Sequence, residues 1–73
     1  GGKILLLIEF TNPEPAVNLS ETPFNPTQTL QQLEDGAWRL EADMDDTVQL
    51  TGWIEAWRER GGFRKVEKTP IEA

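Results

Sequence analysis

The eight residues KILLLIEF, from Lys3 to Phe10, constrain the fold of this chain more than any other segment. In a β-strand, alternate side chains point to opposite faces of the sheet. The two faces of this strand would carry Ile4, Leu6, Ile8 and Phe10 on one side, and Leu5, Leu7 and Glu9 on the other. Because both faces are largely apolar, we expect a central strand, or a strand whose second face meets a partner.

The segment from Asp45 to Gly62, DDTVQLTGWIEAWRERGG, predicts an amphipathic helix. Its apolar residues recur at the spacing i, i+3, i+4 and i+7, and they are Leu50, Trp53, Ile54 and Trp57. We expect Asp46 to cap the amino end, with Gln49 three residues later, and Gly61 and Gly62 to end the helix. The stripe is best explained as the face that packs on the core, and base stacking by its tryptophans is the weaker interpretation.

The remaining segments alternate between turn signals and short periodic runs. Asn12 followed by Pro13 predicts the start of a short helix, with Asn12 as the N-cap. TQTLQQLE predicts a polar edge strand, and Asp35-Gly36 predicts a two-residue hairpin turn. The next strand alternates core and solvent positions, with Trp38, Leu40, Ala42 and Met44 on its core side. A last short strand is centred on Val66 and ended by Pro70.

The resulting order β-α-β-β-α-β predicts an α+β fold of the ferredoxin-like kind, a four-stranded antiparallel sheet with both helices on one face. Right-handed crossovers put the first and third strands in the middle, in agreement with the apolar first strand. The open face of the sheet would then bring Leu5 and Leu7 beside Arg39, Glu41 and Asp43. Residues 1–73 are long enough for one such domain.

Composition argues against catalysis and against a metal or cofactor site. The chain has no cysteine and no histidine, which removes disulfides, thiolate ligands and the commonest general base. The acidic run Asp43–Asp46 does not match a calcium loop, because Val48 and Ile54 stand where such a loop needs glycine and glutamate. Nor does the spacing of Glu55, Glu59 and Glu67 place two carboxylates in an apolar cleft. We therefore expect a protein that is not an enzyme.

The longest apolar run, Ile4 to Ile8, is too short to span a bilayer, and no signal-peptide pattern follows it. We expect a soluble cytoplasmic protein with no membrane contact. The chain begins with Gly1-Gly2 and an apolar strand follows at once, so we also expect it to be an excised piece of a longer protein.

Charge is distributed unevenly along the chain. The net charge is -6, yet residues 47–73 carry five basic and four acidic side chains, whereas residues 1–46 carry two basic and nine acidic ones. Arg58, Arg60, Arg64 and Lys65 are therefore the candidate residues for binding an anion, with Lys68 nearby. A purely structural role at a helix C-terminus would explain Arg58 and Arg60 well and the others less well. RNA recognition by the sheet is disfavoured, because the open face has no stacking aromatics.

From about residue 28 to residue 71 the sequence resembles the WCX domain, the C-terminal extension of bacterial WYL-domain transcriptional regulators. The residues that carry the resemblance are Asp35-Gly36 before a strand, Asp46-Thr47, Leu50, Trp53-Ile54, a glycine break, Val66 and Pro70. The family commonly has a Gly-Phe-Gly-like corner where this chain has Gly61-Gly62-Phe63, and an arginine near the position of Glu72. The winged helix-turn-helix and WYL domains of such regulators are not present in this sequence.

The resemblance implies a noncatalytic module for dimerisation and effector response, in contact with a WYL domain in the full-length protein. Effectors of that family include single-stranded nucleic acid, and operator DNA would be bound elsewhere. Leu5, Leu7 and Arg39 are the candidate interface residues, because an exposed apolar patch usually marks an interface. The alternative is a free-standing ferredoxin-like domain that binds a small anion or single-stranded nucleic acid through Arg58, Arg60, Arg64 and Lys65.

Overall fold

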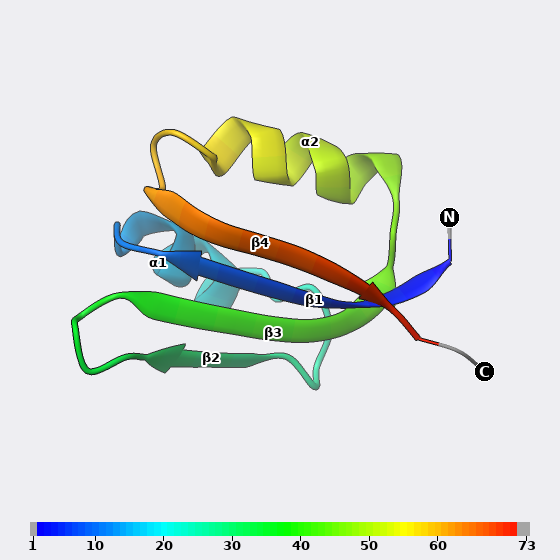
Figure 1. The fold of residues 1–73 in the computed structure, drawn as a ribbon, viewed down its shortest axis with the longest axis horizontal. Helices are drawn as coiled ribbons and strands as arrows, with labels where there is room; N and C mark the ends of the chain where they lie inside the picture. The colour runs from blue at the N-terminus through cyan, green and yellow to red at the C-terminus, as the bar shows by residue number, and fades with distance from the viewer. Residues whose placement is uncertain (1, 72–73) are drawn as a thin grey trace.

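The computed structural model describes residues 2–71 and has the predicted order of elements. Strands β1 (Lys3–Phe10), β2 (Thr29–Gln32), β3 (Trp38–Asp45) and β4 (Phe63–Pro70) form one antiparallel sheet in the order β2-β3-β1-β4. Helices α1 (Glu14–Glu21) and α2 (Val48–Trp57) connect β1 to β2 and β3 to β4 (Figure 1). This is the ferredoxin-like βαββαβ arrangement, as predicted. The position of Glu72 lies outside the described residues.

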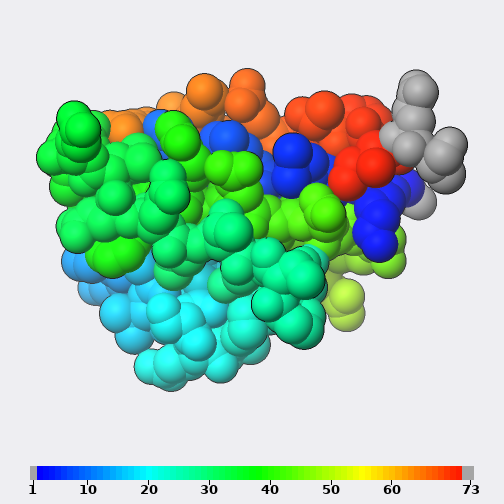
Figure 2. Space-filling model, turned by 90° about the horizontal axis from the view of Figure 1, so that it is seen from below, coloured from blue at the N-terminus to red at the C-terminus, as the bar shows by residue number. Residues whose placement is uncertain are grey.

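Both helices lie on one face of the sheet. Figure 2, seen from the β2 side, shows α1 and the loop after it gathered below the strands, with the other face of the sheet at the top. The core between the layers consists of Ile4, Leu6, Ile8, Phe10, Ala16, Leu19, Leu40, Leu50 and Ile54. Four of these residues come from β1, so the first strand supplies the largest share of the core.

Strand β1 occupies the middle of the sheet and pairs along its whole length. Its partners on β3 run from Lys3 opposite Asp45 to Phe10 opposite Trp38. On the other side β4 pairs with it, with a register shift between Glu9 and Phe10. The Ile71 amide donates to the Lys3 carbonyl at 3.0 Å, which extends this second ladder beyond β4. The prediction of a central strand is therefore confirmed.

The hairpin between β2 and β3 differs from the prediction. Strand β2 is confined to Thr29–Gln32, and the turn has three residues, 34–36, not two. The Leu33 amide donates to the Ala37 carbonyl at 2.7 Å, and Gly36 takes the left-handed conformation with φ of 88°. A type I turn followed by a left-handed glycine is the usual three-residue hairpin, so the Asp-Gly signal located the turn but gave its length wrongly.

Helix α1 begins two residues after the predicted cap. Pro13 is the N-cap residue and makes no side-chain capping bond. The Asn12 side chain instead accepts a hydrogen bond from the Glu14 amide at 2.9 Å, and its own amide group donates to the Arg60 carbonyl at 2.7 Å. Asn12 thus joins the start of α1 to the middle of the α2–β4 connection.

Helix α2 is capped by Thr47, not by Asp46. The Thr47 hydroxyl accepts from the Leu50 amide at 3.1 Å, and Thr47 has the extended backbone typical of an N-cap. Asp46 is occupied by an ion pair with Lys68 at 2.8 Å. The cap prediction was one residue early because both residue types cap well and the sequence pattern allowed either.

The apolar stripe of α2 faces the sheet, as predicted, but its tryptophans are only half-buried. Leu50 and Ile54 are buried, whereas Trp53 packs on the edge of the core and its indole N–H donates to Asn18 at 3.2 Å. Trp57 lies at the margin, with its ring 6.2 Å from that of Trp53 and with the Arg60 guanidinium 4.3 Å above it. The stripe therefore serves packing, and its outer end is a cation–π contact.

Candidate functional site

The open face of the sheet carries a small apolar centre between charged rows. Leu5 and Leu7 of β1 lie opposite Asp43 and Glu41 of β3, as the sequence predicted. Leu5 is 36% exposed, which makes it one of the large hydrophobic residues left accessible to solvent. Both helices pack on the other face, against the core residues of β1, so among residues 2–71 no helix covers this centre.

The two ends of the open face differ in charge. At the end where β1 finishes, Glu9 lies between two basic residues in the register of the sheet. Arg39 of β3 is opposite it on one side, and Lys65 of β4 is opposite it on the other. At the end where β1 starts, Asp43 and Asp45 follow one another on β3 at alternate positions. A shallow depression of about 210 Å³ lies at this acidic end, lined by Leu5, Thr27, Thr29, Glu41, Ala42 and Asp43.

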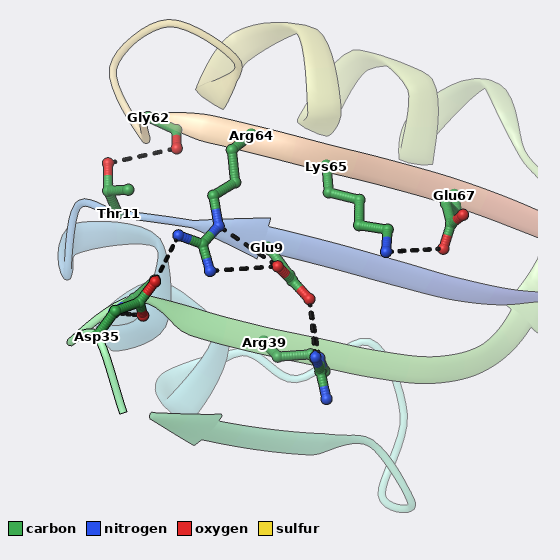
Figure 3. Close-up of polar contacts among 9 residues, drawn as sticks. Glu9, Thr11, Asp35, Arg39, Gly62, Arg64, Lys65 and Glu67 are labelled. Carbon is green, nitrogen blue, oxygen red and sulfur yellow. Dashed lines mark hydrogen bonds and ion pairs between the residues drawn. The ribbon is translucent and has the colours of Figure 1, made fainter. Parts of the chain in front are cut away.

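Four charged side chains form a network across the sheet at the basic end (Figure 3). Glu9 from β1 accepts from Arg39 of β3, at 2.9 Å between Arg39 Nη2 and Glu9 Oε2. The second oxygen of Glu9 is 3.3 Å from Nη2 of Arg64 on β4. Arg64 also bonds Asp35 of the hairpin turn through Nη1, at 2.8 Å. The network joins three strands and the β2–β3 turn, and its two positive and two negative charges balance.

The network shifts the proton affinities of its members. The hydrogen bond from Arg39 is the main cause that holds the pKa of Glu9 below its ordinary value of 4.5, and Arg64 adds to it, while partial burial acts in the opposite direction. The hydrogen bond from Arg64 likewise lowers the pKa of Asp35, with help from the Ala37 amide. The pKa of Arg64 is raised, first by its bond to Asp35. The lowered pKa values of Glu9 and Asp35 favour the ionised form of both carboxylates.

A groove with basic walls runs along β4, and we call it the basic groove. It has a volume of about 420 Å³ and is lined by Phe63, Val66, Arg58, Arg64, Lys65 and Lys68. Arg58 contributes from the carboxyl end of α2, which lies beside β4 in Figure 1. Three of the four residues predicted to bind an anion are thus brought together here, and Lys68 joins them.

Arg60, the fourth predicted residue, is placed elsewhere. Its guanidinium stacks on the Trp57 ring and is not part of the groove lining. Arg64 lines the groove, but its guanidinium is engaged by Glu9 and Asp35. Arg58 and Lys65 have weaker partners, since the oxygens of Glu55 and Glu67 are each 3.7 Å away from them. The most available cations of the groove are therefore Arg58 and Lys65.

Arg39, the predicted charged member of the interface, lies on the open face but is partly used inside the molecule. Its side chain is bound to Glu9 and remains 34% exposed. Sequence reasoning missed Glu9 as the centre of a network. A glutamate at the end of an otherwise apolar strand was a signal for a buried ion pair, but its partners came from residues 30 and 55 positions away in the chain.

Residues 2–71 contain no group of three or more metal-ligating side chains arranged to hold an ion. None of the helices in this range is long and apolar enough to cross a membrane.

The chain matches no protein-family model, and neither curated proteins nor solved structures show a significant match to it.

Proposed function

We propose that this chain is a noncatalytic self-association module that pairs two copies through the open faces of their sheets. The observation that carries the proposal is the uncovered apolar centre formed by Leu5 and Leu7, bordered by a basic end and an acidic end on the same face. Resemblance to the WCX extension supports the same role and adds effector response within a bacterial WYL-type transcriptional regulator.

The register of the sheet determines how two copies would fit. A two-fold axis in the plane of the face, perpendicular to the strands, sets β1 of one copy antiparallel over β1 of the other. With the axis near Leu6, Leu5 of each copy meets Leu7 of the other, and Arg39 meets Asp45. Apolar side chains then pack at the centre and Arg39 meets Asp45 at both ends, whereas Glu41 of each copy faces Asp43 of the other. The apolar contact and the two Arg39–Asp45 pairs must therefore outweigh that repulsion.

Sedimentation of the Leu5→Lys variant tests this pairing. The new lysine faces Asp43 within its own copy, so we expect the fold to be retained. A charge at the centre of the apolar contact should weaken dimerisation by about tenfold or more. The matched control is Val48→Lys, which makes the same change at a residue 88% exposed on α2. A chain that is monomeric at all accessible concentrations, or a dimer that Leu5→Lys leaves unchanged, would contradict the proposal.

The second candidate function is binding of an anionic partner in the basic groove. It is favoured by the convergence of Arg58, Lys65 and Lys68 from two elements onto one depression. Small anions and single-stranded nucleic acid both carry the required charge. Titration with a single-stranded oligonucleotide at two salt concentrations tests this function, because binding that depends on charge weakens as salt is added.

A further inference from the structure

Strand β4 is an exposed edge of the sheet and is longer than the edge on the other side. It has eight residues, whereas β2 at the opposite edge has four. An unpaired edge presents backbone N–H and C=O groups to which another extended chain can pair. The β4 edge is therefore the larger surface available for strand addition.

The register shows which backbone groups of β4 face outward. The Ile71 amide bonds inward to Lys3, and inward and outward groups alternate along an antiparallel strand. Lys65, Glu67 and Thr69 lie an even number of residues from Ile71 and pair with Glu9, Leu7 and Leu5. Val66 and Lys68 therefore direct their amide and carbonyl groups away from β1.

We propose that the β4 edge accepts an extended acidic peptide segment as a fifth strand. The proposal rests on the second function given above, binding of an anion in the basic groove, and names the class of partner. The outward backbone groups of Val66 and Lys68 would pair with the peptide backbone. Acidic side chains of the peptide at alternate positions would lie on the helix side of the sheet, where they would meet Lys68 and, from the end of α2, Arg58.

The groove side chains suit such a partner. Phe63 and Val66 are half-buried and provide an apolar floor beside the edge. Arg58 and Lys65 are 52% and 48% exposed, and their internal partners at 3.7 Å leave donors free for an added carboxylate. Lys68 gives one hydrogen bond to Asp46 and has two further N–H donors.

Charge favours an acidic peptide over a second copy of this strand. Within Phe63–Pro70 there are three basic side chains and one acidic side chain. In a symmetric antiparallel pair centred on Val66, Arg64 of each copy would lie opposite Lys68 of the other, and Lys65 would lie opposite Glu67. The opposite-charge pairs offset the like-charge pairs in part, and each strand still carries a net positive charge. Like charges directly opposite one another destabilise a strand pair. A segment rich in glutamate or aspartate reverses that interaction at every such position.

Amide hydrogen exchange on the wild-type chain provides the test. The probe is a synthetic peptide of eight alternating threonine and glutamate residues, matched in length to β4. Its controls are the peptide with lysine in place of glutamate and the glutamate peptide with N-methylated alternate amides. A single-stranded oligonucleotide of similar charge is the fourth ligand. Binding is followed by anisotropy, and exchange is followed residue by residue by NMR.

We expect the acidic peptide to slow exchange at Val66 and Lys68 specifically. With free peptide at ten times its dissociation constant, exchange at these two amides should slow about tenfold. The inward amides of Lys65, Glu67 and Thr69 are already paired, so they should change little. The lysine peptide and the N-methylated peptide should not produce this protection.

A pair of variants at Val66 checks the role of the backbone. Val66→Pro removes the outward N–H, which an edge strand tolerates, and Val66→Ala removes the same side chain while keeping the N–H. We expect Val66→Pro to lose peptide binding by about tenfold relative to Val66→Ala, the size of one lost hydrogen bond in this setting.

The outcomes separate this inference from the function on which it rests. Binding of the acidic peptide without protection at Val66 and Lys68 would overturn strand addition and leave the anion-binding groove standing. Binding of the oligonucleotide but not of the peptide would do the same and identify nucleic acid as the partner. If no anionic ligand binds at low salt, both strand addition and the anion-binding function of the groove are overturned. Protection of the two amides that rises with protein concentration alone would show that a second copy occupies the edge.

Discussion

At the scale of single residues, Glu9 has the most unusual environment. It is the one charged side chain on β1 between its ends, and it is only 8% exposed. Two arginines from the neighbouring strands supply its hydrogen bonds, and these counterions remain 34% and 40% exposed while the carboxylate itself is nearly covered. Removing the Glu9 carboxylate would leave both arginines without their shared partner, although water would screen part of that loss because both arginines are partly exposed.

The first prediction concerns the acid dependence of stability. The pKa of Glu9 is lower in the folded chain than its ordinary value of 4.5, so its contribution is complete above that value and is lost as pH falls through the lower, folded pKa. The pKa of Asp35 is likewise lowered from its ordinary value of 3.8, so Asp35 also loses its contribution to stability as the pH falls. The free energy of unfolding should therefore stay level near neutral pH and fall in acid.

Glu9→Gln should lower the melting temperature at pH 7 and reduce the acid dependence. Thermal unfolding followed by circular dichroism between pH 2 and 7 measures both effects, with the pH limits chosen to bracket the range of about 2 to 5 in which carboxylates titrate. Glu41→Gln is the control, because it makes the same change on the same face of the sheet outside the network. Equal pH profiles for wild type and Glu9→Gln would contradict the importance of the network.

Two glycines should respond oppositely to the same substitution. Gly62 has φ of 64°, and a Cβ there would overlap the Thr11 hydroxyl. Gly62→Ala should therefore destabilise the chain by about 1–3 kcal/mol. Gly52 lies inside α2 with open space around it, so Gly52→Ala should stabilise by roughly 0.5–1 kcal/mol. Urea unfolding of the two variants measures both changes, and a neutral Gly62→Ala would show that the corner is less constrained than its geometry indicates.

At the scale of elements, α2 depends on Thr47 for its start. Thr47→Ala removes the hydroxyl that accepts from the Leu50 amide and should lower the free energy of unfolding by about 1 kcal/mol. Asp46→Ala should cost less, about 0.5 kcal/mol, because it removes an exposed ion pair with Lys68. Chemical denaturation compares the two variants. A larger effect of Asp46→Ala would mean that the aspartate is the true cap.

The strands show how far the sequence predicts the sheet. Lys3–Phe10 is bounded as expected, because its apolar residues fix both its length and its central position. The polar edge strand was predicted too long, since TQTLQQLE has no apolar alternation that would mark where pairing stops. The third turn residue follows from the backbone pairing of Leu33 with Ala37 and from the left-handed conformation of Gly36, and neither is specified by the Asp-Gly pair alone.

At the scale of the whole molecule, the candidate surfaces were predicted unevenly. Alternation along β1 and β3 was sufficient to place Leu5 and Leu7 beside Glu41 and Asp43. The basic residues near the carboxyl end were correctly grouped by charge, except that Arg60 turns to the Trp57 ring. Ion pairs such as Arg64 with Asp35 depend on how three strands and a turn meet, which local patterns do not contain.

The central position of β1 has a consequence for the time course of folding. Both neighbours of β1 come from the second half of the chain, so its pairing requires closure of long loops, which slows folding. Until Trp38 and the residues after it are present, the segment from Ile4 to Ile8 has no strand to pair with. Such apolar β-prone segments aggregate when exposed.

A fragment ending at Ala37 should therefore remain unstructured by circular dichroism and should precipitate at concentrations where the full chain stays clear. Adding the complementary fragment from Trp38 onward supplies both missing neighbours of β1 and should restore the sheet signal. During synthesis, β1 leaves the ribosome before either strand that pairs with it, so its apolar side chains stay accessible to other chains until β3 and then β4 follow.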